Sequence, residues 1–136
     1  MRKIVMVSLA ICICMAPLQL TAARYDASAP LLCAVIQVFE CGVEGDCYPV
    51  TAEVANIPHF LNINFKKKII TATEESGRED MTKIKNFERF NGKIVLQGSE
   101  NGRGWTIVIS EETGKLSATV SDEQVGFVVF GVSTQL

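Results

Sequence analysis

The C-terminal two-thirds of the chain alternates apolar and polar residues with a period of two. Residues 105–110 and 116–120 follow this alternation, and short turn-forming segments separate such runs. Because alternate side chains of a strand point to opposite faces, each run predicts a strand with one core face. The apolar positions expected on that face are Trp105, Ile107, Ile109, Leu116, Ala118 and Val120.

Turn signals separate these runs into hairpins. In "ERFNGKIVLQG", Asn91-Gly92 supplies the positive φ angles of a type I′ hairpin turn. Residues 111–114 predict a four-residue turn with Gly114 in the left-handed conformation. Residues 60–73 predict a third hairpin with lysines at its tip, and residues 98–104 a Gly-rich bend between two strands.

Two further runs are apolar without clear alternation. Residues 31–41 are rich in β-branched side chains, which favours a strand, although a buried helix of this length is the alternative. Residues 126–132 are apolar on both faces, which predicts a central or covered strand. The fold class is therefore all-β, a small antiparallel meander barrel of about eight strands, because closure removes exposed edges. A two-sheet β-sandwich is the alternative.

The N-terminus has the layout of a secretory signal peptide. Two basic residues precede an apolar run that is short for a membrane span, and small residues follow it. We expect cleavage after Ala22 or Ala23, so that residues 1–23 are a signal peptide and residues 24–136 a single β domain. An uncleaved anchor is the alternative, and Ile11 before Cys12 disfavours a lipoprotein. The prediction is a periplasmic or secreted protein without a stable membrane anchor.

The charge balance disfavours one class of partner. The chain has a formal net charge of −2, which becomes −4 once Arg2 and Lys3 leave with the signal peptide. Nucleic-acid binding normally shows as a basic surplus, so no nucleic-acid partner is expected. The only basic run, residues 66–68, is interpreted as a solvated hairpin tip, with contact to an anionic partner as the alternative.

Three cysteines remain after cleavage, and chain geometry restricts their pairing. Cys33 and Cys41 would lie roughly 26 Å apart in a strand and about 12 Å apart in a helix. A disulfide needs Cα atoms within roughly 7 Å, which leaves Cys41–Cys47 or Cys33–Cys47. We favour Cys41–Cys47, because Gly42 and Gly45 let the intervening loop turn back. Cys33 is then expected to be a buried free thiol.

Motifs for catalysis, metal binding and cofactor binding are missing or incomplete in the sequence. His59 is the only histidine, and no nucleophile elbow accompanies it or Cys33. Zinc would need all three cysteines plus His59, and an exported protein usually oxidises such cysteines. The acidic loop at residues 40–46 does not follow the EF-hand order of calcium ligands, and no phosphate-binding loop is present. No catalytic residue, metal or cofactor is therefore predicted.

The C-terminal segments "GWTIVIS", "TGKLSATV" and "VGFVVFG", with the signal peptide and cysteine cluster, carry a resemblance. Together they resemble small exported bacterial proteins without assigned function. In size and strand pattern the chain is also similar to calycin-like barrels, which include periplasmic lysozyme inhibitors. That similarity concerns architecture, and fold alone does not imply function.

The leading functional hypothesis is a non-enzymatic periplasmic or secreted binding protein. Its ligand would be a small apolar molecule inside the barrel or a protein partner at one barrel end, and Trp105, Phe127 and Phe130 are the candidate pocket wall. The first alternative is an inhibitor or interaction factor of the cell envelope that acts through its loops. An enzyme that pairs His59 with Cys33 is the second.

Overall fold

The period-two runs form strands of one antiparallel sheet in the computed structural model, which describes residues 25–136. The predicted signal peptide lies outside these residues. One 3-10 turn, η1 (Glu74–Ser76), also forms within them. The ten strands are β1 (Leu31–Gly42), β2 (Cys47–Val50), β3 (Phe60–Asn64), β4 (Ile69–Ala72), β5 (Met81–Lys83), β6 (Asn86–Phe90), β7 (Lys93–Glu100), β8 (Arg103–Ser110), β9 (Lys115–Ser121) and β10 (Val125–Gln135).

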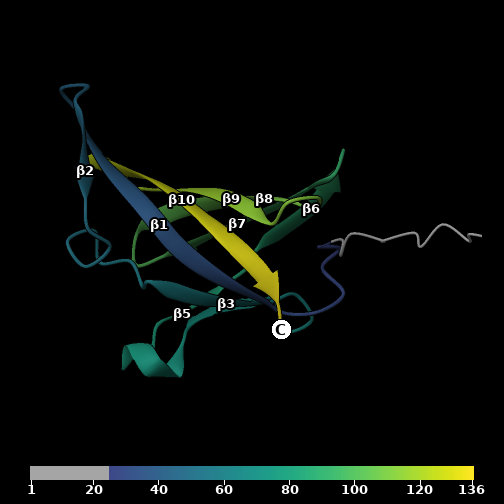
Figure 1. Ribbon diagram of the computed structural model, residues 1–136. Coiled ribbons are helices and arrows are strands. Elements are labelled where there is room, and N and C mark those ends of the chain that lie inside the picture. Colours follow the sequence, from purple (N-terminus) through teal and green to yellow (C-terminus); the bar gives the residue numbers. More distant parts are fainter. Residues whose placement is uncertain (1–24) are drawn as a thin grey trace, which may run out of the picture.

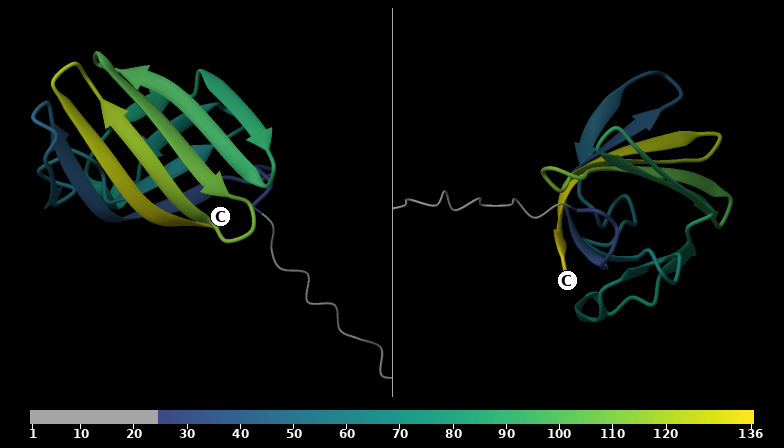
Figure 2. Two further views of the ribbon diagram at one scale, coloured as in Figure 1. Left: turned by 90° about the horizontal axis from the view of Figure 1, so that it is seen from above. Right: turned by 90° about the vertical axis from the view of Figure 1, so that its right-hand side faces the viewer.

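The sheet curls so that its two edges meet within one continuous stretch of chain. Its strand order is β5-β4-β3-β1-β10-β9-β8-β7-β6, with β2 paired to β1. Residues 81–90 contain both edge strands: β5, which pairs with β4, and β6, which pairs with β7. Between them, the Lys85 N–H donates to the Gln97 carbonyl at 2.9 Å. The curl is visible in Figures 1 and 2, and it confirms the all-β antiparallel prediction in its barrel form.

The turn predictions are confirmed by backbone angles. Asn91 and Gly92 both have positive φ, at 54° and 75°, between β6 and β7. Gly114 has a φ of 68° at the end of the turn between β8 and β9. The Gly-rich bend is a second Asn-Gly turn, because Asn101 and Gly102 also have positive φ, at 49° and 79°. This turn fixes the register of β7 against β8.

The two apolar runs are the longest strands and lie side by side. Residues 31–41 form β1, a strand as favoured, and residues 126–132 lie in β10, which pairs with both β1 and β9. A register shift between Val35 and Gln37 bends β1. The first part of β1 pairs with β3, and its last part pairs with β2 to form the β1–β2 hairpin (Figure 1).

The buried side chains divide into two clusters inside the curl. The larger cluster centres on the fully buried residues Leu31, Ile63, Ile94, Leu96 and Ile109. The smaller one contains Val38, Ala52, Ala55, Phe127 and Val129 and lies under the segment that follows β2. Ala118 and Val120 of β9 pack against both clusters but stay only partly buried.

Candidate functional site

The space between the two clusters is a cavity of about 750 Å³ that opens among loops at one end of the sheet. On its wall, Trp105 of β8, Val120 of β9 and Phe127 of β10 are direct cross-strand partners. The next row inward is Ile107, Ala118 and Val129 in the same strands. The inner faces of three consecutive strands therefore make an apolar wall.

Small side chains on β9 keep this space open. Alternation directs Leu116, Ala118 and Val120 inward, yet only Leu116 of the three is buried. An inward side chain of an interior strand can stay accessible only if the barrel is not filled at that level. Ala118 and Val120 thus mark the transition from packed core to cavity.

Trp105 lies flat across the neighbouring strand instead of filling the cavity. Its indole N–H donates to Thr82 Oγ1 of β5 at 3.0 Å. To reach Thr82, the ring passes over Gly98 of β7, where a Cβ atom would lie 2.2 Å from Trp105 Cζ2. Gly98 is therefore required by close approach, and the hydrogen bond holds the indole as part of the wall.

Arg103 sits at the cavity mouth and is held by two partners. Its Nε donates to Asp122 Oδ2 at 3.2 Å, and its guanidinium carbon lies 5.7 Å from the centre of the Phe127 ring. The Asp122 carboxylate also accepts the backbone N–H groups of Gln124 and Val125 at 2.9 Å each. These backbone hydrogen bonds are the main cause of the lowered pKa of Asp122. Asp122 thus stays ionised opposite Arg103 at neutral pH.

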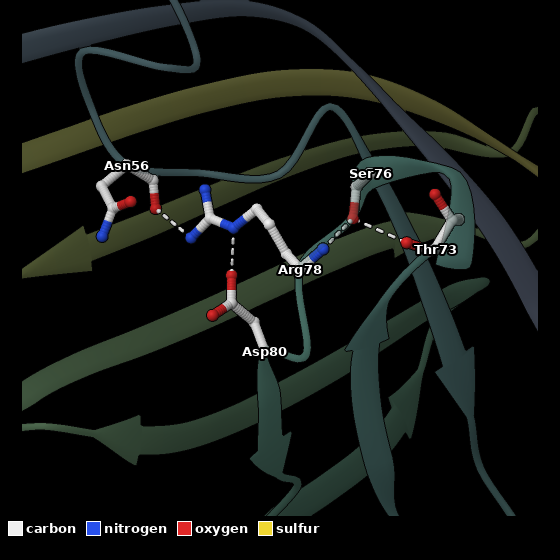
Figure 3. Close-up of polar contacts among 5 residues, drawn as sticks. All are labelled: Asn56, Thr73, Ser76, Arg78 and Asp80. Carbon is white, nitrogen blue, oxygen red and sulfur yellow. Dashed lines mark hydrogen bonds and ion pairs between the residues drawn. The ribbon is translucent and has the colours of Figure 1, made fainter.

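Two loops meet across the mouth through Arg78. Its Nε donates to Asp80, and its Nη2 donates to the Asn56 carbonyl at 3.3 Å (Figure 3). Asn56 belongs to the turn after β2, where the Val54 N–H donates to Thr51 Oγ1 at 3.3 Å. Arg78 follows the η1 turn, and its own N–H donates to Ser76 Oγ at 3.2 Å. A single guanidinium thus connects the loops on either side of the opening.

The three residues predicted as a pocket wall do not share a face. Trp105 and Phe127 line the cavity, but Phe130 does not. Its side chain is 46% exposed on the outer face of β10, where it makes an edge-to-face contact with Phe39. Phe127 and Phe130 are three positions apart in a regular strand, so alternation directs them to opposite faces. Placing Phe130 in the wall is therefore corrected, and Val129 takes the inner position.

The cysteine prediction is confirmed. Cys41 and Cys47 are cross-strand partners in β1 and β2 and form a disulfide, with Cα atoms 4.1 Å apart. Cys33 is a free, buried thiol that borders the cavity. Burial raises its pKa to about 12, so the thiol is protonated at neutral pH.

The His59 side chain lies on the surface, whereas Cys33 is buried, although the His59 carbonyl accepts the backbone N–H of Val35 on the same strand as Cys33. His59 Nε2 is 2.5 Å from Glu53 Oε1, and both side chains are more than half exposed. The hydrogen bond from His59 is the main cause that lowers the pKa of Glu53 to about 2. Within residues 25–136, no three His, Cys, Asp or Glu side chains are grouped to hold a metal ion. In the same range, no helix is long and apolar enough to cross a membrane.

Comparisons with protein-family models, with curated proteins and with solved structures give no match for this chain. The resemblance to exported calycin-like proteins therefore stays a prediction. The candidate site rests on the geometry of the cavity and its mouth.

Proposed function

We propose that this chain is an exported, non-enzymatic binding protein that holds a small apolar molecule in the cavity of its sheet. The observation that carries the proposal is the 750 Å³ cavity with its apolar wall, open at one end. This volume lies within the range of pockets that take small-molecule ligands, roughly 300–1,000 Å³. Small barrels of about eight strands have room for one such ligand.

Export is supported by the disulfide, because such bonds persist in oxidising compartments outside the cytoplasm. Binding is favoured over catalysis because the only histidine is held at the surface by Glu53, while Cys33 is buried and protonated. These residues would be the base and nucleophile of the alternative enzyme, and they face different surroundings.

The test is the affinity for N-phenylnaphthylamine, a neutral apolar molecule whose fluorescence rises in apolar surroundings. We expect saturable binding, and we expect Ala118→Phe to weaken it about tenfold or more, because the added ring occupies the cavity. Thr119→Phe is the matched control, since Thr119 is the next residue of β9 and is exposed on the outer face. Equal affinities in the two variants would place binding outside the cavity.

A second candidate function, protein interaction through the loops, is favoured by the tip of the β1–β2 hairpin. There Val43 and Tyr48 are 81% and 61% exposed beside the disulfide. If the cavity is the functional site, the double variant V43S/Y48S keeps its affinity for N-phenylnaphthylamine. If the function lies in the loops, this variant loses a protein partner, and A118F retains it.

A further inference from the structure

The mouth of the cavity carries more negative than positive charge. The charged residues that line the cavity are Arg78, Arg103, Glu79, Asp80 and Glu100. Arg78 pairs with Asp80, and Arg103 pairs with Asp122, which lies just outside the lining. Among residues 25–136, Glu79 and Glu100 have no ion-pair partner and are exposed. The unpaired charges at the opening are therefore both carboxylates.

The loops around this opening extend the same charge. Antiparallel pairing brings the loops after β1, β2, β4, β7 and β9 to one end of the sheet (left in Figure 1). Their further acidic residues are Glu44, Asp46, Glu53, Glu74, Glu75 and Glu123. Five lysines lie instead at the opposite end, in or beside the turns at residues 66–68, 93 and 115, whereas Lys85 donates from Nζ to Ser99 Oγ on β7. A cleft with charge of one sign and apolar walls concentrates its field at the opening, which attracts ligands of opposite charge.

The aromatic wall is also suited to a cation. The ring of Phe127 already has the Arg103 guanidinium over it at 5.7 Å, and Trp105 lies across β9 from it in the same row. Aromatic faces attract cations, and the attraction grows when the pair is desolvated. An anionic head group would instead approach Glu79 and Glu100, and it would compete with Asp80 and Asp122 for the two arginines.

We infer that the ligand is a cationic amphiphile: its apolar body fills the cavity between Trp105 and Phe127, and its ammonium or guanidinium group lies at the mouth near Glu79 and Glu100. This inference rests on the proposed function, and it adds the charge of the ligand. The role of Arg78 and Arg103 is then structural, since each is neutralised by its own carboxylate and holds a part of the rim in place.

The experiment compares three amphiphiles with the same dodecyl chain in competition with N-phenylnaphthylamine. They are dodecyltrimethylammonium, dodecanoate and the neutral dodecyl maltoside, each below its micelle concentration, at neutral pH and low salt. We expect the cation to bind about three- to tenfold more tightly than the carboxylate, an effect of two partly exposed charges. High salt is expected to reduce that preference.

Two charge-matched variants locate the effect. E79Q/E100Q is expected to lose the preference for the cation, whereas E88Q/E112Q keeps it, because Glu88 and Glu112 are exposed residues toward the opposite end. Equal or tighter binding of dodecanoate, or an unchanged preference in E79Q/E100Q, would overturn the inference and leave the proposed function standing. The same holds if none of the three competes with bound N-phenylnaphthylamine. Failure of N-phenylnaphthylamine itself to bind would overturn both.

Discussion

Along β7, β8 and β9 the same alternating pattern gives an inner face that is packed at one end and hollow at the other. Toward the start of β1, the inner row Ile94, Ile109 and Leu116 is buried. Two inward-facing rows further along the same strands, the residues are Gly98, Trp105 and Val120, and a cavity opens beside them. The difference lies in side-chain volume. Alternation decides which face is inside, whereas the sizes of the inward residues decide whether the inside is filled.

The largest expected effect comes from shortening a side chain at the packed end. Ile109→Ala removes methyl and methylene groups from a fully buried site, and we expect a loss of about 3–4 kcal/mol in unfolding free energy. Val120→Ala at the hollow end is expected to cost under about 1 kcal/mol, because Val120 is only partly buried. Urea denaturation measures both values. Similar losses would contradict the division into a packed and a hollow end.

Gly98→Ala tests the way in which Trp105 forms the cavity wall. The added methyl would meet both the indole ring and the Lys83 carbonyl, the latter at 2.6 Å, and we expect a loss of about 2–3 kcal/mol. Trp105 fluorescence should change with it, since the ring must leave Thr82. Gly104→Ala is the matched control, because a Cβ atom at Gly104 would meet nothing within 4 Å and little stability should be lost. If the two substitutions cost the same, Gly98 does not support the ring.

The disulfide tests how the hairpin at the hollow end is held. With a sequence separation of only six residues, Cys41–Cys47 should stabilise the fold by about 2 kcal/mol. The double variant C41S/C47S should show that loss, and reduction of the unmodified protein should reproduce it. Reducing the disulfide in the Cys33→Ala variant should still lower the unfolding free energy of that variant, because Cys33 takes no part in the disulfide. Stability that does not respond to reduction would argue against the pairing.

The smallest effect concerns the Glu53–His59 pair on the outer side of the mouth. The pKa of Glu53 is lowered from 4.5 to about 2, so the pair stabilises the fold above about pH 4.5. That stabilisation is lost as pH falls toward 2. The Tm deficit of Glu53→Gln should therefore shrink over this interval, and Glu123→Gln, which removes an exposed loop carboxylate, is the matched control. A Tm deficit that stays constant with pH would show that the deficit does not come from the charge of the Glu53 carboxylate.

Strand positions and turns were predictable because they depend on local sequence. The alternation in residues 105–120, the Asn91-Gly92 turn and the short Cys41–Cys47 loop are each read from a few neighbouring residues. Alternation also excludes Phe130 from the face of Phe127. The error of placing Phe130 in the pocket wall was therefore avoidable from the sequence. The position of the Asn101-Gly102 turn was enough to predict that Gly98 pairs with Trp105, because the two residues are equally far from the turn along the chain.

The cavity and its mouth could not be predicted in the same way. The cavity volume depends on side chains from eight strands and two loops, and no single segment of sequence determines it. The bond from Arg78 to the Asn56 carbonyl joins residues 22 positions apart in two irregular loops. No pattern of period or spacing indicates such a contact, because it arises only after the sheet has curled.

Energy transfer from Trp105 to bound N-phenylnaphthylamine tests the central claim most directly. Trp105 is the only tryptophan of the chain and lies in the cavity wall, so it is a donor at a known place. A ligand inside the cavity should quench the tryptophan strongly and saturate at one molecule per chain, and Ala118→Phe should raise the ligand concentration needed for this effect about tenfold or more. Binding without transfer, or transfer that A118F leaves unchanged, would contradict a ligand site inside the sheet.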